Sequence, residues 1–390
     1  MTRYSFNNQA TIPGRVIQSV DWVLFGAVFL LVCAGLVTMY SFGGESPFFN
    51  RQLVWIGAGI IVFFGLSIAD MRFLKRTDVV VVLYGVGVCI LLLLAVFGTA
   101  TKGAQSWLSV GGFGIQPADP IKIALILLLS KYFSRRHIEI AHIRHIIVSG
   151  VYAAVPFVLI FLQPDFGSAL IIGAIWLGMV GVSGISKKHL FAVFAVSALS
   201  LTILWNGAFT LEQKERISTF LHPLADIQGA GYHAYQSTIA VGSGQLLGKG
   251  VGYGTQSRLE FLPEYETDFI FAAFAEEWGL AGSFLILILF GIVIWRLIRM
   301  SFTMTGNVEK LFTLGTAVYL GSHMVIHVGM NIGLLPVTGL PLPFVSYGGS
   351  HILTECIALG IVMAYHARTF RYRSDGGVKE IVGVDATGLS

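Results

Sequence analysis

Charged residues are scarce in this chain. Aspartate, glutamate, lysine and arginine make up 12% of its 390 residues, while hydrophobic residues make up 55%. This composition excludes an ordinary water-soluble globule, which carries about twice that share of charge. The hydrophobic residues gather in continuous runs of about 20, the length at which an α-helix crosses a bilayer. We therefore predict an all-α polytopic membrane protein, because a β-barrel would alternate apolar and polar residues.

Cysteines and the common catalytic motifs are also few or missing. Cys33, Cys89 and Cys356 are dispersed within apolar runs, which predicts neither a disulfide framework nor a zinc site. The sequence has no P-loop, G-x-S-x-G, H-E-x-x-H or Rossmann fingerprint, so nothing indicates nucleotide-driven chemistry. No basic run is interleaved with aromatic residues on a soluble face, so we expect no nucleic-acid partner.

The apolar runs predict about ten membrane spans. The boundary between the fifth and the sixth depends on a short turn at Gln163–Asp165. The spans are expected at 20–41, 51–69, 78–98, 117–134, 143–162, 165–183, 189–206, 268–295, 309–334 and 343–366.

Lysine and arginine predict the orientation. With the N-terminus in the cytoplasm, most of them fall in the cytoplasmic loops, as the positive-inside rule requires for an even number of spans. We therefore expect an N-in, C-in protein with a membrane domain at 20–366, a cytoplasmic N-terminus at 1–19 and a cytoplasmic tail at 367–390. The polar N-terminus indicates no cleavable signal peptide, and we expect disorder after Tyr372.

A long extracytoplasmic loop, 206–267, separates the seventh and eighth spans. It is rich in glycine and longer than most loops, which indicates either function or disorder. Aromatic and β-branched residues between the glycines favour short ordered amphipathic pieces on the outer leaflet. One of them is predicted as a helix at 234–241, with Gln236 and Ser237 on its polar side.

Asp268 is the principal candidate for chemistry. It precedes the apolar sequence FIFAAFAEEWG, so it lies at or just inside the start of a helix, where free N–H groups favour its ionised form. An ionised carboxylate there can accept a proton from a sugar hydroxyl. The same position suits a simple N-cap, and position alone leaves both roles open.

Four glutamates flank Asp268. Glu264 and Glu266 suit solvated loop charges, or auxiliaries for a substrate or metal, better than a base. We count Glu264 among the candidate substrate-binding residues. Glu276 and Glu277 lie two turns into the helix, where exposure to lipid would cost about 2.5–3.5 kcal/mol. We expect both to form hydrogen bonds inside the bundle.

A second group of charges begins the fourth span. In the sequence QPADPIK, Asp119 and Lys122 are three residues apart and share one face of a helix. A lysine inside a membrane must pair or line a wet cavity. Two interpretations stay open: a self-contained ion pair, or a cationic group that binds a diphosphate. Arg51, at the outer end of the second span, is another candidate for phosphate oxygens.

Two turns complete the set of candidates. Asp165, in the sequence QPDFG, suits a cap of the following helix better than a ligand, although it can face the same cavity. The segment Leu340–Ser350 reads LPLPFVSYGGS, and its prolines and glycines interrupt a span. Membranes tolerate such an interruption only where the backbone is buried in protein or lines water. We expect this segment to shape a cavity.

Together these motifs resemble the SEDS family of shape, elongation, division and sporulation proteins. The resemblance covers roughly 17–372 and rests on Gly229–Gly279, Gln163–Gly167, Gln116–Lys122 and Gly339–Ser350, in that family's order. The RodA-like subgroup is favoured over the FtsW-like one. The fourth-span motif departs from the family's usual QPSEhhK, where h is apolar or small, because here an aspartate replaces the glutamate and Pro120 follows it.

The resemblance implies a ten-helix peptidoglycan glycosyltransferase of the bacterial cytoplasmic membrane. Such enzymes polymerise lipid II and release undecaprenyl diphosphate, beside a class B penicillin-binding protein and other elongation or division machinery. The family's essential aspartate matches Asp268, and its conserved cations match Lys122 and Arg51. We expect inverting sugar transfer, with Asp268 as base and the cations, with or without Mg²⁺ or Mn²⁺, on the leaving diphosphate.

Other functions stay open from the residues alone. A lipid II flippase would need ionisable residues near the midplane and repeat symmetry, whereas the candidates here cluster toward the outer face. A scaffold that recruits a penicillin-binding protein explains the helices but not the acid and the cations. A role in division rather than elongation is a further alternative.

Overall fold

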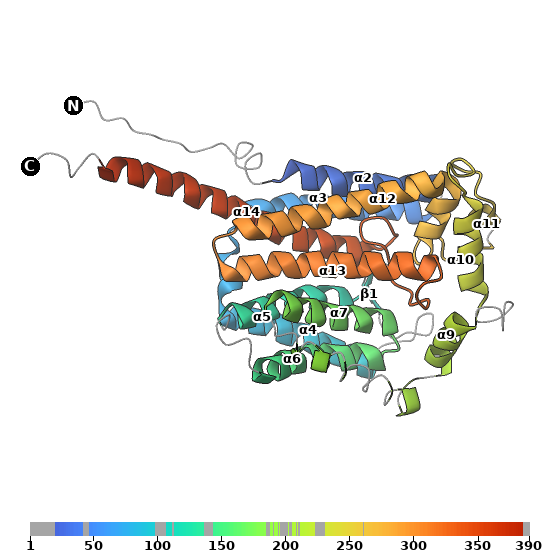
Figure 1. The fold of residues 1–390 in the computed structure, drawn as a ribbon, viewed down its shortest axis with the longest axis horizontal. Helices are drawn as coiled ribbons and strands as arrows, with labels where there is room; N and C mark the ends of the chain where they lie inside the picture. Colours follow the sequence, from blue (N-terminus) through green and yellow to red (C-terminus); the bar gives the residue numbers. More distant parts are fainter. Residues whose placement is uncertain are drawn as a thin grey trace, which may run out of the picture.

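The computed structural model describes residues 20–41, 47–97, 107–110, 113–135, 143–184, 188–189, 191–193, 195, 202, 205–207, 209, 211–222, 231–259 and 261–384. Its long helices lie side by side and run along a common direction (Figure 1). The pieces of the predicted outer loop lie together at one end of this bundle, and the C-terminal helix extends beyond the opposite end.

Seven of the described helices are long and apolar enough to cross a membrane, and α7 is a shorter apolar helix. The expected spans appear as helices except the seventh, at 189–206, most of which lies outside the described residues. The helices of the bundle are α2 (Trp22–Ser41), α3 (Pro47–Ile68), α4 (Thr77–Phe97), α5 (Ala118–Ser134), α6 (Ile143–Leu162), α7 (Phe166–Val182), α12 (Ile270–Thr303), α13 (Asn307–Asn331) and α14 (Gly349–Val384).

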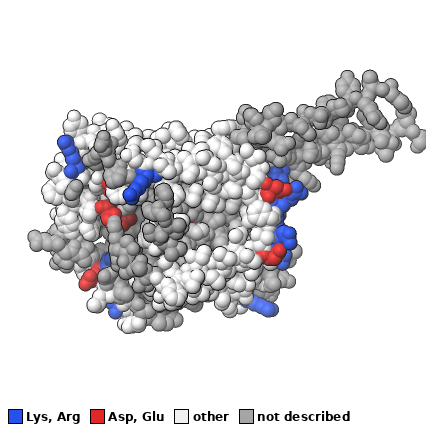
Figure 2. All heavy atoms as spheres, turned by 180° about the vertical axis from the view of Figure 1, so that it is seen from behind, with Lys and Arg blue, Asp and Glu red and all other residues white. Residues whose placement is uncertain are grey.

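The sides of the bundle are apolar. Large hydrophobic side chains such as Ile61 (74% exposed) and Val96 (72% exposed) face outward. Figure 2 shows charged residues gathered toward the two ends of one face, with a belt of other residues between them. On α12, the guanidinium group of Arg299 lies 5.4 Å from the ring centroid of Trp295. An apolar belt edged by aromatic and cationic side chains is typical of a membrane-spanning bundle.

α13 lies at the centre and packs against α12, α5 and α7. Two glycines allow α13 to pack closely against α5 and α7. A Cβ on Gly315 would meet Cγ2 of Ile126 at 2.6 Å, and a Cβ on Gly178 would meet Cγ1 of Val318 at 2.4 Å. Lipid supplies no strong hydrophobic drive between helices, so close packing at small residues holds them together.

The outer pieces are α9 (Leu211–Leu221), α10 (Tyr232–Ser243) and α11 (Thr255–Arg258). α10 contains the helix predicted at 234–241 and packs against α12 and α13. Ser237, which we placed on the polar side, is buried rather than facing water, because its hydroxyl donates a hydrogen bond to the carbonyl of Asn331 at 2.9 Å.

Two further local predictions were wrong, and a short hairpin and a 3-10 helix were not predicted. α14 begins at Gly349 rather than near residue 343, because Pro341 and Pro343 lack N–H donors and restrain the preceding backbone. α14 then continues to Val384, so the segment after Tyr372 is helical that far; extending an existing helix avoids the cost of nucleation. A short antiparallel hairpin of β1 (Leu108–Val110) and β2 (Phe113–Ile115) adds to the helices, and the 3-10 helix η1 (Met71–Lys75) joins α3 to α4.

α12 is interrupted at Gly279, whose φ of 66° and ψ of −163° are not helical. A helix break leaves backbone donors and acceptors unpaired, and apolar surroundings make this costly. The segment after α10 inserts its own backbone into the break and satisfies these groups. The bonds run from the N–H groups of Lys249 and Gly250 to the carbonyls of Glu276 and Glu277 (both 3.0 Å), and from the N–H groups of Leu280 and Ala281 to the carbonyls of Gln245 and Leu246 (2.8 and 3.1 Å).

The two glutamates beside the break make the internal hydrogen bonds that we expected. Oε1 of Glu276 accepts from Nζ of Lys249 at 2.6 Å and from the backbone N–H of Thr255 at 2.9 Å. Oε1 of Glu277 accepts from the N–H of Gly252 at 2.6 Å. Both side chains are buried. They therefore fix the outer segment to α12.

We predict that Gly279→Ala destabilises the fold by about 3 kcal/mol or more, because it adds backbone strain to a clash. The new Cβ would lie 2.3 Å from the backbone nitrogen of Gly248. The thermal unfolding midpoint of the detergent-purified variant should fall clearly. Gly291→Ala is the matched control, because nothing lies within 4 Å of a Cβ there, and it should leave the midpoint unchanged or raise it slightly. Equal midpoints for the two variants would contradict the inserted-loop explanation.

Candidate active site

Asp268 lies in the turn that leads into α12. The helix begins at Ile270 and its N-cap is Phe269, which provides no side-chain cap, so Asp268 is not the simple N-cap that position alone allowed. Its backbone N–H donates to the carbonyl of Glu264 at 3.0 Å, which closes the turn. The residue is half-buried. The bundle therefore carries a carboxylate at the end where the outer pieces lie.

The cap of α12 comes from another helix. Oδ1 of Asn331, the last residue of α13, accepts the N–H of Ala272 at 3.1 Å. Its Nδ2 donates to the backbone carbonyl of Asp268 at 3.1 Å and to that of His327 at 2.8 Å. Asn331 was not predicted from the sequence, because an asparagine near the end of a long apolar helix gives no sign of a contact 63 residues away.

The segment Gly339–Gly348 forms a wall beside Asp268. Gly339 has a φ of 69°, and a Cβ there would lie 3.4 Å from Oδ2 of Asp268. The hydroxyl of Ser346 and the N–H of Tyr347 donate to backbone carbonyls of the turn, at 2.7 and 2.8 Å. The predicted cavity-shaping loop and the predicted base are thus fixed to each other.

Gln52 of α3 holds the far end of this loop. Its Nε2 donates to the carbonyl of Ser346 at 3.1 Å, and its Oε1 accepts the N–H of Gly348 at 3.2 Å. The preceding residue, Arg51, is exposed. The arginine was predicted from the sequence as a candidate, but the buried glutamine was not, because its role depends on a loop nearly 300 residues later.

α13 and α14 hold the rest of the loop. On α13, Nδ1 of His327 lies 2.7 Å from the carbonyl oxygen of Leu340. On α14, Oε2 of Glu355 accepts the N–H of Phe344 at 3.0 Å. Phe344 has a φ of 62°, a conformation that a bulky residue adopts only where its surroundings impose it. The loop is therefore a fixed part of the site.

Asp119 and Lys122 form a buried ion pair. Nζ of Lys122 lies 3.1 Å from Oδ1 of Asp119, and their side chains are 1% and 3% exposed. Nδ1 of His351 lies 3.3 Å from the same oxygen, and its Nε2 lies 2.9 Å from Oε1 of Glu355. The shorter aspartate thus still reaches its lysine. The structure supports the self-contained pair rather than a lysine that is open to a diphosphate.

Asp165 is the helix cap that we considered more suitable than a ligand. It is the N-cap of α7, where its Oδ1 accepts the N–H of Ser168 at 2.9 Å. Its Oδ2 accepts a hydrogen bond from Nε2 of Gln116 at 2.8 Å. Both carboxylate oxygens are therefore engaged, and the turn is tied to the start of α5.

Glu264 lies in the turn that closes on Asp268. It is exposed, has a φ of 51°, and its Oε2 accepts from the Thr267 hydroxyl at 3.2 Å. The ring of His233 on α10 packs 6.4 Å from that of Phe269, centroid to centroid. Desolvation lowers the pKa of His233, while the Glu264 carboxylate opposes this by favouring the charged ring.

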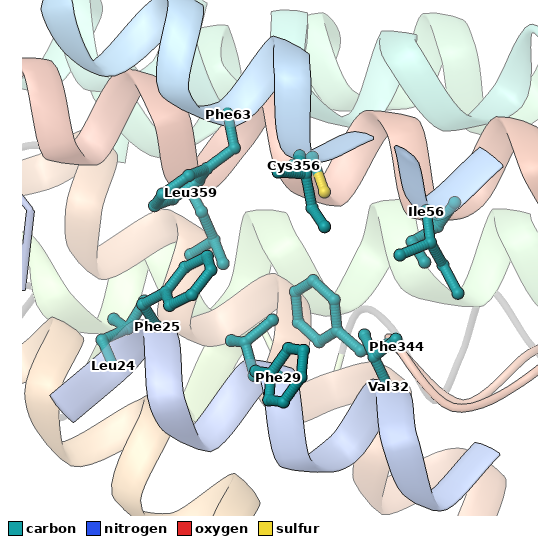
Figure 3. A pocket seen from close by; sticks show the side chains of 12 residues that line it. Leu24, Phe25, Phe29, Val32, Ile56, Phe63, Phe344, Cys356 and Leu359 are labelled. Carbon is teal, nitrogen blue, oxygen red and sulfur yellow. The ribbon is translucent and has the colours of Figure 1, made fainter. Parts of the chain in front are cut away.

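Two further features bear on ligands. Among the described residues, no group of three or more His, Cys, Asp or Glu could hold a metal ion. A pocket between α2, α3 and α14 is lined by apolar side chains such as Phe25, Phe29 and Phe63, and Phe344 reaches it from the loop (Figure 3). Apart from the thiol of Cys356, the side chains that line this pocket are apolar.

The whole bundle matches a known family. The pattern of the family described as cell cycle protein, which covers FtsW, RodA and SpoVE, matches residues 15–370. The chain belongs to the FtsW/RodA/SpoVE family. This membership agrees with the resemblance inferred from the motifs.

Several FtsW/RodA/SpoVE relatives are similar along most of the chain. The peptidoglycan glycosyltransferase MrdB of Escherichia coli K12 is 34% identical, over 86% of this chain and 90% of its own. A probable peptidoglycan glycosyltransferase FtsW of Nitrosococcus halophilus is 31% identical, over 95% and 97%. Stage V sporulation protein E of Bacillus subtilis is 32% identical, over 88% and 96%.

Solved FtsW/RodA/SpoVE-like structures share the fold. A chain from a peptidoglycan synthase complex, described as coordinating polymerization and crosslinking, superposes with a TM-score of 0.77 at 29% identity and covers 90% of this chain and 98% of its own. The rod shape determining protein RodA of Thermus thermophilus superposes with a TM-score of 0.67 at 28% identity, over 90% and 97%.

We predict that Lys122→Met destabilises this family member by about 3–5 kcal/mol, because it leaves Asp119 as a buried carboxylate without its lysine. The readout is the thermal unfolding midpoint in detergent. Arg76→Met is the control: its pair with Asp78 is exposed, at 69% and 63%, so its loss should leave the midpoint unchanged. An unchanged midpoint in Lys122→Met would show that the ion pair does not stabilise the fold. It would then favour the alternative in which Lys122 binds a diphosphate.

Proposed function

We propose that this protein is a peptidoglycan glycosyltransferase. It polymerises lipid II into glycan strands at the outer face of the bacterial cytoplasmic membrane, for cell-wall synthesis and cell elongation. Membership of the FtsW/RodA/SpoVE family and the names of the relatives MrdB and FtsW support this reaction. The observation that carries it is the half-buried Asp268 carboxylate, held against a clamped loop at one end of an apolar bundle.

Asp268 is the proposed general base. It takes the proton from the 4-hydroxyl of the acceptor's terminal N-acetylglucosamine while that oxygen attacks the anomeric carbon of the lipid-linked N-acetylmuramic acid. The bond from this carbon to the diphosphate breaks, and its electron pair leaves with undecaprenyl diphosphate. One carboxylate is enough, because the leaving group needs no proton and the configuration inverts in a single displacement.

The cations have different parts in this reaction. Arg51 is exposed near the start of α3, so its guanidinium can reach diphosphate oxygens in a forked contact. Lys122 is buried against Asp119 of the same helix, so we assign it to pairing this carboxylate, which also contacts His351 of α14, rather than to substrate. Glu264, exposed beside the base, is an auxiliary substrate contact.

The membrane arrangement belongs to the same proposal. Ten spans with both termini in the cytoplasm place Asp268 outside, and the bias of lysine and arginine supports this orientation. A class B penicillin-binding protein is the proposed partner, supported by the similarity to a synthase complex that coordinates polymerization with crosslinking. Lipid II, the membrane and other elongation or division machinery complete the set of partners.

The test is glycan polymerisation from purified lipid II. We predict that Asp268→Ala lowers the rate by at least about 10²-fold, because removing a general base costs 10²–10⁴-fold. The thermal unfolding midpoint should stay near that of the wild type. The matched control is Asp78→Asn, which removes one exposed carboxylate from the first turn of α4 and should polymerise normally.

Each protein is assayed with and without a class B penicillin-binding protein. Near-normal polymer from Asp268→Ala would remove Asp268 as the base. No polymer from the wild type in either condition, together with transfer of lipid II across vesicle bilayers, would replace the glycosyltransferase by a flippase.

A further inference from the structure

We propose that Asn331 is the positioning residue that orients Asp268 for proton transfer. This inference rests on the proposed function and adds a residue on a different helix to it. Asn331 is fully buried and ends α13, at the same end of the bundle as α10 and the start of α12 (Figure 1). Its buried side chain does not face a substrate, so we place it as a support of Asp268 rather than as a substrate contact.

Both the NH₂ group and the oxygen of the Asn331 side-chain amide form hydrogen bonds. Nδ2 donates to the carbonyl of Asp268 (3.1 Å) and to that of His327 (2.8 Å), and Oδ1 accepts from Ala272 (3.1 Å). The Ser237 hydroxyl lies 3.4 Å from the same Oδ1. A planar amide with two donors and an acceptor fits this set, whereas a carboxylate lacks the donors and an alkyl group lacks both.

These bonds determine where the base points. An N-cap side chain normally takes the N–H of the third helical residue, which here is Ala272. Because Asn331 takes it instead, the turn before α12 can close with Asp268 outside the helix. The bond to the Asp268 carbonyl then fixes the orientation of that residue's backbone. A reacting group displaced by about 1 Å can lose about 10²-fold in rate.

α13 also fixes the opposite side of Asp268. One turn before Asn331, His327 contacts the carbonyl of Leu340, and Leu340 follows Gly339, the glycine beside Oδ2 of Asp268. The same helical turn thus holds the backbone of the base and the loop that faces its carboxylate. Small shifts of α13 would move both together, which preserves the gap between them.

The experiment compares three variants with the wild type in lipid II polymerisation. Asn331→Asp keeps the acceptor for Ala272 and the shape of the side chain but loses the donor to Asp268. Asn331→Ala loses both. Ser237→Ala is the matched control, because its hydroxyl contacts Asn331 but not Asp268. For each we measure kcat, KM and the thermal unfolding midpoint.

We expect Asn331→Asp and Asn331→Ala to lower kcat by about 10–100-fold. The KM for lipid II should stay within about threefold of the wild type, because the substrate contacts are unchanged. Ser237→Ala should keep kcat within about threefold. A purely structural role would lower the amount of folded enzyme without changing the kcat of what remains folded.

Three results would overturn the inference. They are an unchanged kcat in both Asn331 variants, a loss that follows the fall in folded protein, or an equal loss in Ser237→Ala. Asp268→Ala, assayed in parallel, separates this inference from the proposed function. If that variant polymerises normally, the base assignment fails whatever Asn331 does. If it is inactive while the Asn331 variants are normal, the positioning role alone fails.

Discussion

Most of this structure follows from one constraint: backbone N–H and C=O groups that lie away from water must form hydrogen bonds within the protein. A continuous helix meets that need within itself, but this protein interrupts its helices at three places near the candidate site: before α12, at Gly279, and between α13 and α14. Each interruption exposes donors and acceptors that lipid cannot pair. Each is filled by protein from elsewhere: an asparagine amide, the backbone of the segment after α10, and a set of buried side chains.

The same requirement explains why so many polar residues are buried. Gln52, His327, Asn331 and Glu355 are each at most 1% exposed, and each bonds a backbone group of an interruption. None of them needs to react with anything. Their hydrogen bonds hold the irregular backbone in place. The carboxylate of Asp268 is thereby kept beside Gly339. A buried polar side chain in this fold therefore marks a support of the site more often than the site itself.

The features that could be predicted from the sequence are those encoded by continuous segments of the chain, above all the helices. Long apolar segments gave most helices to within a few residues, and α6 at Ile143–Leu162 agrees at both ends. Asp268 was identifiable because a polar segment meets an apolar one there. The cap by Asn331, the clamp by Gln52 and the partnership of His351 with Asp119 could not be predicted, because each joins residues that are far apart in the chain and pack together only in the fold. Lys122 shows the opposite case: its type suggested a phosphate contact, but its partners lie within the protein.

The length of α12 has a consequence for where the reaction takes place. The break at Gly279 divides it into 270–278 and 280–303, and the longer part alone spans about 36 Å, enough to cross the ~30 Å of hydrocarbon in a bilayer. Trp278, 39% exposed next to the break, suits the boundary between lipid tails and headgroups. From Ile270 to Trp278 the helix rises about 12 Å, so the turn that holds Asp268 lies at least that far along the helix from Trp278. In the proposed reaction, a lipid-linked sugar therefore meets Asp268 outside the hydrocarbon while its lipid tail stays in the membrane.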